Sequence, residues 1–224
     1  MAVLRILGLC VWGVRTVWHT ESDGVFFCPD CGGDRSYRRR TGRRLLTVMG
    51  LPVAPRGQAG PVVECSACHG RHGTEALEHP TSARLTAMLR DAAHAVALAV
   101  LVAGGPDSRR ARRAAAEAVR EAGFPDCTEE ELRALLAVRC PDGTPADDCG
   151  NRLAEQLRDA LGPLAGHLAL QGCEHLLVQG ARIALSDGPY LPAEREALAA
   201  VGRCLMMSPE HTDSTLEAVA RTPS

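Results

Sequence analysis

Two stretches of sequence decide the fold at the start of this chain: VFFCPDCGG at residues 25–33 and VVECSAC at residues 62–68. Each contains a Cys-x-x-Cys pair, and the four residues are Cys28, Cys31, Cys65 and Cys68. The two-residue spacing lets both thiolates of a pair reach one metal ion, and Gly32, after the first pair, permits the tight turn. Four thiolates complete a closed tetrahedral shell. We therefore predict a structural metal site, for which thiolate ligands and this geometry favour Zn²⁺.

Other interpretations of these cysteines stay open. They could be two redox dithiols, although such motifs need a βαβ context that the flanking sequence does not show, or unrelated buried cysteines. His69 and His72 follow the second pair closely and could replace one thiolate as a ligand. Four cysteines already suffice for the shell, so we expect neither histidine to be required.

The sequence between the two pairs predicts strands. Residues 36–40 and 45–49 are short β-like runs on either side of Thr41-Gly42, and residues 60–64 lead directly into Cys65. Residues 24–75 therefore resemble the zinc-ribbon modules found at the start of many small bacterial proteins. The matching elements are Val25-Phe26-Phe27, Cys28/Cys31, Tyr37-Arg38-Arg39-Arg40, Leu51-Pro52-Val53 and Val63-Glu64-Cys65-Ser66-Ala67-Cys68. This resemblance implies a fold and says little about function.

Composition divides the chain into two modules. The 224 residues carry a net charge of −2, are 46% hydrophobic and only 3% aromatic, and contain no Lys. These values exclude a collagen-like, largely disordered or multipass membrane protein. Between Cys28 and His72 there are eight Arg against three acids, whereas residues 79–224 hold 15 Arg against 20 acids. We predict a basic zinc-ribbon domain over residues 1–78 and an acidic helical domain over residues 79–224.

The first 18 residues, MAVLRILGLCVWGVRTVW, raise the question of targeting. Arg5 and Arg15 interrupt the apolar run, which is shorter than the roughly 20 residues that span a bilayer. A cleaved signal peptide needs small residues after its apolar stretch, and Val17 and Trp18 stand there instead. We expect one or two buried strands rather than a membrane-associated start. The protein is then cytoplasmic, without stable membrane insertion.

Five arginines lie close together between the cysteine pairs: Arg38, Arg39, Arg40, Arg43 and Arg44. Arginine presents a planar donor fork suited to phosphates, so these residues could contact nucleic acid or a protein partner. The alternative is a solvated hairpin on a module too small to hide charge. Single-strand binding also favours aromatic side chains for stacking, and only Tyr37 is close by in the sequence.

From residue 81 to 221 the pattern is helical, and we expect seven or eight helices with a Leu, Ala and Val core. Start signals include Thr81 and Ser82, the capping-box pair Thr128/Glu131, and Ser208-Pro209. Residues 141–148 separate two groups of helices. Residues 103–106 are echoed by residues 186–189, and other pairs recur at an offset of about 80. The sequence therefore predicts a bundle with an internal pseudo-two-fold repeat.

Residues 184–198, ALSDGPYLPAEREAL, resemble the A-x-x-D-G-x-x-x-x-x-E-x-x-x-L signature of the TerB-like, tellurite-resistance family. Ser208-Pro209-Glu210 is similar to the start of that family's next helix, and the resemblance extends over residues 82–220. It implies an all-α bundle, an association with metal or oxyanion stress, and protein partners within a stress-response system. It does not imply an enzyme.

Asp187, Glu194 and Glu196 match acidic positions of that family pattern. Carboxylate oxygens that converge at a helix start could hold Ca²⁺ or Mg²⁺. The alternative is local: Asp187 completes a turn, while the two glutamates favour the first turn of a helix through its dipole. The corresponding positions of the first copy are Gly104, Ala111 and Arg113, which do not provide a two-sided acidic site.

The remaining cysteines, among them Cys140, Cys149 and Cys173, lack knuckle spacing, and we expect them to be packed in the core. Cys173 with His175 is an alternative ligand pair or nucleophilic pair, without an orienting motif beside it. The sequence thus predicts a non-catalytic cytoplasmic stress-response module that binds zinc. The alternative is a nucleic-acid-binding regulator that uses the basic ribbon, and an enzyme comes third.

Overall fold

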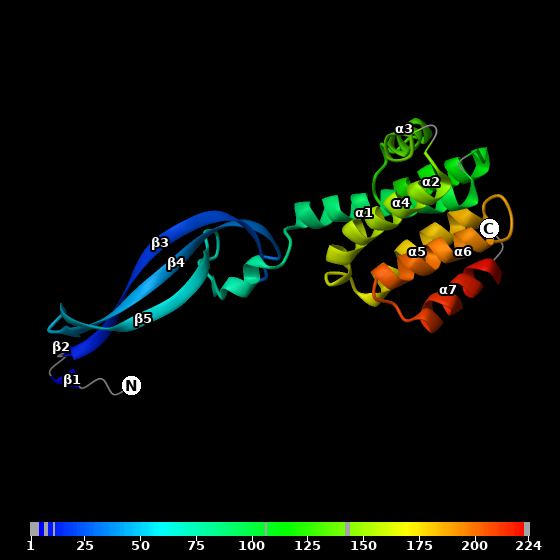
Figure 1. Cartoon of the computed structure of the whole chain (residues 1–224). Helices are drawn as coiled ribbons and strands as arrows, with labels where there is room; N and C mark the ends of the chain where they lie inside the picture. The colour runs from blue at the N-terminus through cyan, green and yellow to red at the C-terminus, as the bar shows by residue number, and fades with distance from the viewer. Residues whose placement is uncertain (1–4, 7–8, 11, 106, 142–143, 222–224) are drawn as a thin grey trace. The chain divides into compact units, whose positions relative to one another are not determined.

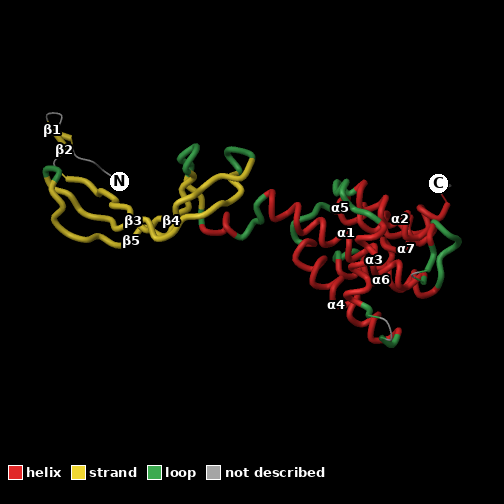
Figure 2. Tube along the Cα trace, turned by 90° about the horizontal axis from the view of Figure 1, so that it is seen from above, coloured by secondary structure: helices red, strands yellow, loops and turns green. Residues whose placement is uncertain are grey.

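The computed structural model describes residues 5–6, 9–10, 12–105, 107–141 and 144–221. The chain forms two compact units, Met1–Arg84 and Leu85–Ser224. Figure 2 shows that strands and α-helices are segregated along the chain, with the strands in the first unit. The predicted order of a sheet followed by a helical domain is therefore confirmed.

The first unit is an antiparallel sheet of four strands in the order β3-β4-β5-β6, preceded by a two-stranded hairpin, β1-β2 (Figure 1). The elements are β1 Arg5–Ile6, β2 Leu9–Cys10, β3 Trp12–Cys28, β4 Gly33–Val48, β5 Leu51–Cys65, β6 Arg71–His72 and the 3₁₀ turn η1 Thr74–Leu77. Its small core lies at the cysteine end of the sheet. Phe26 and Val63 are buried there, and Tyr37 packs edge-on against Phe26 with the ring centroids 5.6 Å apart.

Strand β4 is continuous, which corrects the expectation of two short runs separated at Thr41-Gly42. Gly42 is buried in mid-strand between its neighbours β3 and β5. A Cβ atom on Gly42 would lie 2.7 Å from Thr16 Cγ2 and 2.9 Å from Ala59 Cβ. The glycine therefore marks a close approach between side chains of adjacent strands rather than a turn.

The strand expected in the first 18 residues is present, but the expected burial is wrong for its described side chains. Residues 12–18 are all exposed or half-buried, and Trp12 is 44% exposed. The eight residues at the start of β5 are exposed as well. Since successive side chains of a strand point to opposite faces, this part of the sheet has solvent on both faces. The β4–β5 connection is the two-residue turn Met49-Gly50, whose φ angles of 52° and 84° are typical of a tight hairpin.

The second unit contains the α-helices apart from the first three residues of α1, and the described residues hold seven α-helices, as expected. They are α1 Ser82–Gly104, α2 Arg109–Glu121, α3 Glu129–Arg139, α4 Ala146–Ala165, α5 Leu170–Leu185, α6 Pro192–Cys204 and α7 Pro209–Arg221. Thr128 and Ser208 cap α3 and α7, because their side-chain oxygens accept the N–H groups of Glu131 and His211. Gly180 allows α1, α5 and α6 to pack closely, since a Cβ atom there would lie 2.9 Å from both Val96 and Leu198.

Helix α1 is long and apolar enough to cross a membrane by length and composition alone. Half of its most apolar window is buried inside the structure. Ala92, Val96 and Val100 belong to the core of the helical unit, with exposed fractions of 2% or less. The apolar character of α1 is thus accounted for by its place in that core.

The break expected at residues 141–148 falls between the end of α3 and the first turn of α4, with α1-α2-α3 before it and α4-α5-α6-α7 after it. Helices α5, α6 and α7 all contact one another, and in the first group α2 contacts α3. The pseudo-two-fold repeat stays a prediction.

Cys140 and Cys149 form a disulfide that joins the end of α3 to the first turn of α4. Cys149 is buried in the core and Cys140 packs against it, as expected, but the expectation that both are free thiols is wrong. Their Cα atoms lie 5.3 Å apart, and α3 and α4 are in contact. Disulfides persist in oxidising compartments, so this pair and the expected cytoplasmic location point in different directions. The compartment stays a prediction.

Candidate metal centre

The two Cys-x-x-Cys pairs lie in two turns of similar backbone geometry at the same end of the sheet. In the β3–β4 turn the N–H of Gly32 donates to Cys28 O at 2.9 Å, and in the β5–β6 turn the N–H of His69 donates to Cys65 O at 3.0 Å. Gly32 and His69 both have positive φ, 64° and 58°. The second turn therefore places a histidine where the first places the expected glycine, and its side chain is exposed.

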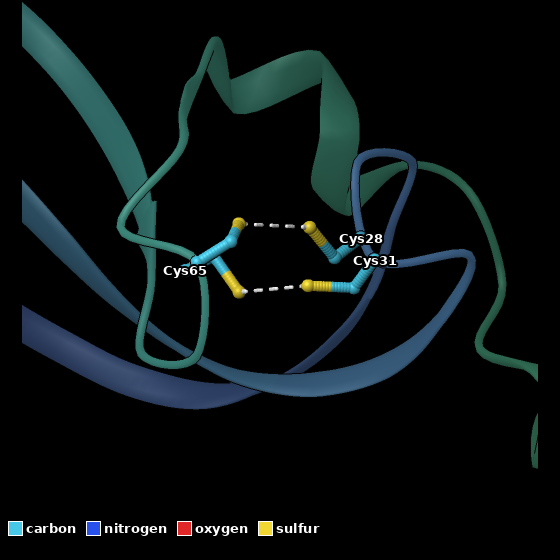
Figure 3. A group of neighbouring side chains, drawn as sticks. Cys28, Cys31 and Cys65 are labelled. Carbon is cyan, nitrogen blue, oxygen red and sulfur yellow. Dashed lines mark hydrogen bonds between the residues drawn. The ribbon is translucent and has the colours of Figure 1, made fainter.

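The structure brings the four sulfur atoms together. Cys28 Sγ lies 3.8 Å from Cys68 Sγ, and Cys31 Sγ lies 4.0 Å from Cys65 Sγ. Figure 3 shows Cys28 and Cys31 facing Cys65, with both sulfur pairs between the two turns. A tetrahedral Zn²⁺ with Zn–S bonds of about 2.3 Å separates its sulfurs by about 3.8 Å. The four cysteines, all free thiols, thus fit one tetrahedral ion.

Burial and hydrogen bonding make the four thiols unequal. Cys28 and Cys65 are completely buried, whereas Cys68 is exposed. Burial by itself would raise the pKa of Cys65, but the backbone N–H groups of Cys68 and Ala67 bring it down to about 7. The neighbouring thiol of Cys68, together with burial, raises the pKa of Cys31 to about 12. The pKa values of Cys31 and Cys65 thus differ widely, and a divalent cation would favour loss of the proton from each thiol that it binds.

His72 stands beside this cluster. Its Nε2 atom lies 3.8 Å from Cys28 Sγ and 3.4 Å from Asp30 Oδ2, and its ring packs against Phe26. Cys28, Asp30 and His72 form a second arrangement of ligand-type atoms around the same sulfur. The four-sulfur group is the complete one, so His72 is best described as an outer neighbour of Cys28 that can hydrogen-bond to its thiolate.

The five arginines lie on the central strand β4, where the alternation of side chains divides them between the two faces of the sheet. Arg39 pairs with Glu21 at 3.6 Å, and Arg40 pairs with Glu64 at 3.0 Å. Arg38, Arg43 and Arg44 are exposed, with no ion pair among the described residues. The five residues therefore do not form one patch, and two of them are neutralised.

Sequence reasoning missed the contribution of Trp18 and Arg71 to this region. Trp18 is paired with Gly42 across β3 and β4, and the Arg71 guanidinium lies 4.9 Å above the Trp18 ring. Arg71 also donates to Glu64 at 3.2 Å, which links it to Arg40. No local signal joins residues 18, 42 and 71, because their proximity depends on the register of all four strands of the sheet.

The acidic residues of the helical unit have separate positions. Glu194 is 2% exposed and accepts the N–H of Leu191 at 2.8 Å, which caps the start of α6. Burial raises the pKa of Glu194, against the lowering effect of that N–H group. Asp187 and Glu196 are exposed, and the described residues contain no metal-type grouping of these three carboxylates. Glu194 thus stabilises the first turn of α6, as the alternative interpretation predicts. A Ca²⁺ or Mg²⁺ site at the three acidic residues stays a prediction.

The alternative pair Cys173 and His175 is not arranged as a nucleophile and base. Cys173 is buried, and burial raises the pKa of its thiol, the opposite of activation. The His175 Nε2 atom lies 3.1 Å from Gln179 Nε2, and this amide in turn donates to Ala118 O. The two side chains therefore take part in packing and in a hydrogen-bonded link between helices.

Residues 184–198, which carry the resemblance to the TerB-like family, span the end of α5, the connecting turn and the first half of α6. Tyr190 in this turn donates its hydroxyl to Leu216 O at 3.2 Å, which ties the turn to α7. The turn is thus a structural junction of the three last helices. The resemblance stays a prediction, since no family model, no curated protein and no solved structure matches this chain.

Proposed function

We propose that this protein is a non-catalytic zinc-binding protein whose first unit is folded by one structural Zn²⁺. The observation that supports this proposal is the convergence of four sulfurs, from two turns 33 residues apart in sequence, at separations of 3.8 and 4.0 Å. A shell closed by four protein ligands leaves no position for a substrate, so the ion acts on folding rather than on chemistry.

The small buried core of the sheet unit supports the proposal that this unit needs a metal ion to fold. Its buried core consists of Phe26, Val63 and two of the cysteines. So small an apolar core supplies little stability, and small domains of this kind depend on metals or disulfides. The ion would join the β3–β4 and β5–β6 turns and hold the long strands in register.

The role of the helical unit is proposed from the resemblance of residues 184–198. It would bind a protein partner of a system that responds to tellurite or metal stress. Cells that lack the protein would then be more sensitive to tellurite, and expression of the full chain would restore their resistance. Unchanged tellurite sensitivity would contradict the proposed role of the helical unit, but it would not bear on the proposal that the ribbon binds zinc.

The zinc proposal is tested by metal analysis of the purified full chain after dialysis against a weak chelator. Replacement of the four ribbon cysteines by Ser should remove one equivalent of zinc, and unfold the sheet unit. Cys204→Ser is the matched control, because Cys204 is a half-buried free thiol outside the ribbon. A zinc content that is the same in the four-cysteine variant and the control would overturn the proposal.

A second candidate function is binding of nucleic acid by the sheet. The observation that favours it is the aromatic–cation pair of Trp18 and Arg71 beside exposed arginines of β4. Binding should weaken steeply with salt, with a slope of about −0.7 per phosphate contact for a single strand. Arg44→Glu should weaken binding and lower that slope, whereas Arg110→Glu on α2 should not. Affinity that does not depend on salt would rule this candidate out.

A further inference from the structure

The helical unit contains a second group of metal-ligating side chains, distant in sequence from the ribbon. His94 projects from the middle of α1, while Cys127 and Glu131 lie four residues apart at the start of α3. The ligand atoms of all three lie within 4.8 Å of one another. One side chain offers nitrogen, one sulfur and one oxygen, and each of these is a donor type that Zn²⁺ binds in proteins.

The backbone around α3 fixes the two ligands of that helix. Thr128 caps α3 by accepting the N–H of Glu131 at 3.1 Å. Cys127 O accepts from Arg120 Nη1 at 3.2 Å, and Cys127 N donates to Phe124 O at 3.2 Å. The turn before α3 is therefore anchored on both sides of Cys127.

Glu131 departs from the capping box that its spacing from Thr128 predicts. In a full box, the glutamate side chain returns a bond to the backbone N–H of the capping residue. In the described part of the chain the Glu131 carboxylate has no hydrogen bond and no ion pair, and it is grouped with His94 and Cys127 instead. The carboxylate is thus available as a ligand.

The two ring nitrogens of His94 have different environments. Its Nδ1 atom lies 2.8 Å from Arg90 O, and a carbonyl can only accept, so Nδ1 carries the proton. The lone pair is then on Nε2, which is inaccessible to solvent and has no hydrogen-bond partner among the described residues. A histidine held by a carbonyl through one nitrogen, with the other free, has the arrangement typical of a metal ligand.

We infer that His94, Cys127 and Glu131 bind a second Zn²⁺ ion in the helical unit. Imidazole and thiolate ligands with a single carboxylate favour Zn²⁺ over Ca²⁺ or Mg²⁺, which prefer oxygen atoms only. In contrast to the ribbon, three protein ligands leave the fourth position of a tetrahedral ion open to water or another small ligand.

Two members of the group also border a cavity. His94 and Glu131 line a cavity of about 710 Å³ between α1, α3 and α4. Its wall also carries charged side chains of both signs, including Arg90, Arg152 and Asp159. Cys127 is 3% exposed and belongs to the core of the helical unit, so its sulfur would hold the ion from the core side.

Metal stoichiometry of the full chain tests this inference. The wild-type protein should bind two equivalents of Zn²⁺. Glu131→Gln should lower the affinity for the second equivalent by at least about tenfold, because loss of a side chain that only hydrogen-bonds to a zinc ligand already has an effect of that size. Glu130→Gln is the matched control, since Glu130 is exposed and occupies the same first turn of α3. Glu131 is itself exposed, so its variant should fold normally.

Co²⁺ substitution separates the two sites. His94→Asn and Cys127→Ser should each remove one equivalent of Co²⁺, and Cys127→Ser should remove the thiolate absorption of one sulfur while that of the ribbon remains. The variant without ribbon cysteines should keep one equivalent and the absorption of a single thiolate. If the ribbon proposal fails and the second site holds, the wild type should bind one equivalent that is lost in Cys127→Ser and kept in the variant without ribbon cysteines. One equivalent in the wild type, unchanged in Glu131→Gln and Cys127→Ser, would overturn the second site.

Discussion

The carboxylate of Asp34 accepts the backbone N–H of Ser82 at 2.8 Å, across 48 residues of sequence. Ser82 is the first residue of α1, where N–H groups have no partner within the helix. The same carboxylate accepts from Ala83 at 3.3 Å, while Thr81 accepts the N–H of Arg84 as its sequence predicts. A side chain next to the β3–β4 turn thus completes the cap of the first helix.

This cap should make the start of α1 sensitive to acid. The hydrogen bond from Ser82, followed by that from Ala83, holds the pKa of Asp34 below its ordinary value. The stabilisation is then fully present above the ordinary carboxyl pKa of about 3.9 and is lost as pH falls through the lower folded value. The amide signals of Ser82 and Ala83, followed by NMR from pH 6 to pH 2, should shift in parallel with Asp34. In Asp34→Asn they should show no such titration; a titration that persists in this variant would contradict the assignment.

Gly42 should tolerate no side chain. In Gly42→Ala the new Cβ atom would meet Thr16 and Ala59 at less than 3.0 Å within a paired strand. Overpacking of this kind costs about 1–3 kcal/mol, so the sheet unit should lose that much free energy of unfolding in denaturant titrations. Gly60→Ala is the control, because a Cβ atom on Gly60 meets nothing within 4 Å. Equal stabilities of the two variants would show that Gly42 is not tightly packed.

The features that could be predicted from the sequence are those that depend on residues close together in the chain. The spacing of Cys28 to Cys31 and of Cys65 to Cys68 is enough to predict two tight turns that each carry a pair of thiols, because each turn is four residues long. Apolar periodicity and capping residues such as Thr128 are likewise enough to predict helices. These features depend on neighbours within a few residues in the sequence.

The features that were missed depend on distant partners. Gly42 looks like a turn residue in isolation, and only the side chains of adjacent strands give it a place in mid-strand. His94 and Cys127 meet because α1 and the start of α3 lie together, which no periodicity encodes. The disulfide partner of Cys140 also could not be chosen from spacing alone. Packing and strand register decide such contacts, and one sequence does not reveal them.

Removal of zinc should unfold the sheet unit and spare the helices. Structural zinc contributes roughly 10–16 kcal/mol of apparent binding free energy in small zinc-folded domains, more than the core around Phe26 can supply. The helical unit has a separate and much larger core, from Ala92 to Leu216. A strong chelator should therefore leave the helical circular dichroism signal almost unchanged while amide signals of β3 to β5 collapse. Loss of both signals together would show that the two units unfold as one.

Reduction of the Cys140–Cys149 disulfide should destabilise the helical unit moderately. The bond closes a short loop, since nine positions separate the two cysteines. Chain-entropy arguments for a loop of this size give about 2–3 kcal/mol of stabilisation, through restriction of the unfolded state. The double variant Cys140→Ala/Cys149→Ala should thus lose about that much free energy of unfolding, and a reducing agent should have the same effect on the wild type but none on the variant. Cys204→Ala controls for the loss of a half-buried sulfur. A wild type whose stability does not respond to reduction would contradict this account, because the loop would then be restricted by helix packing instead of by the bond.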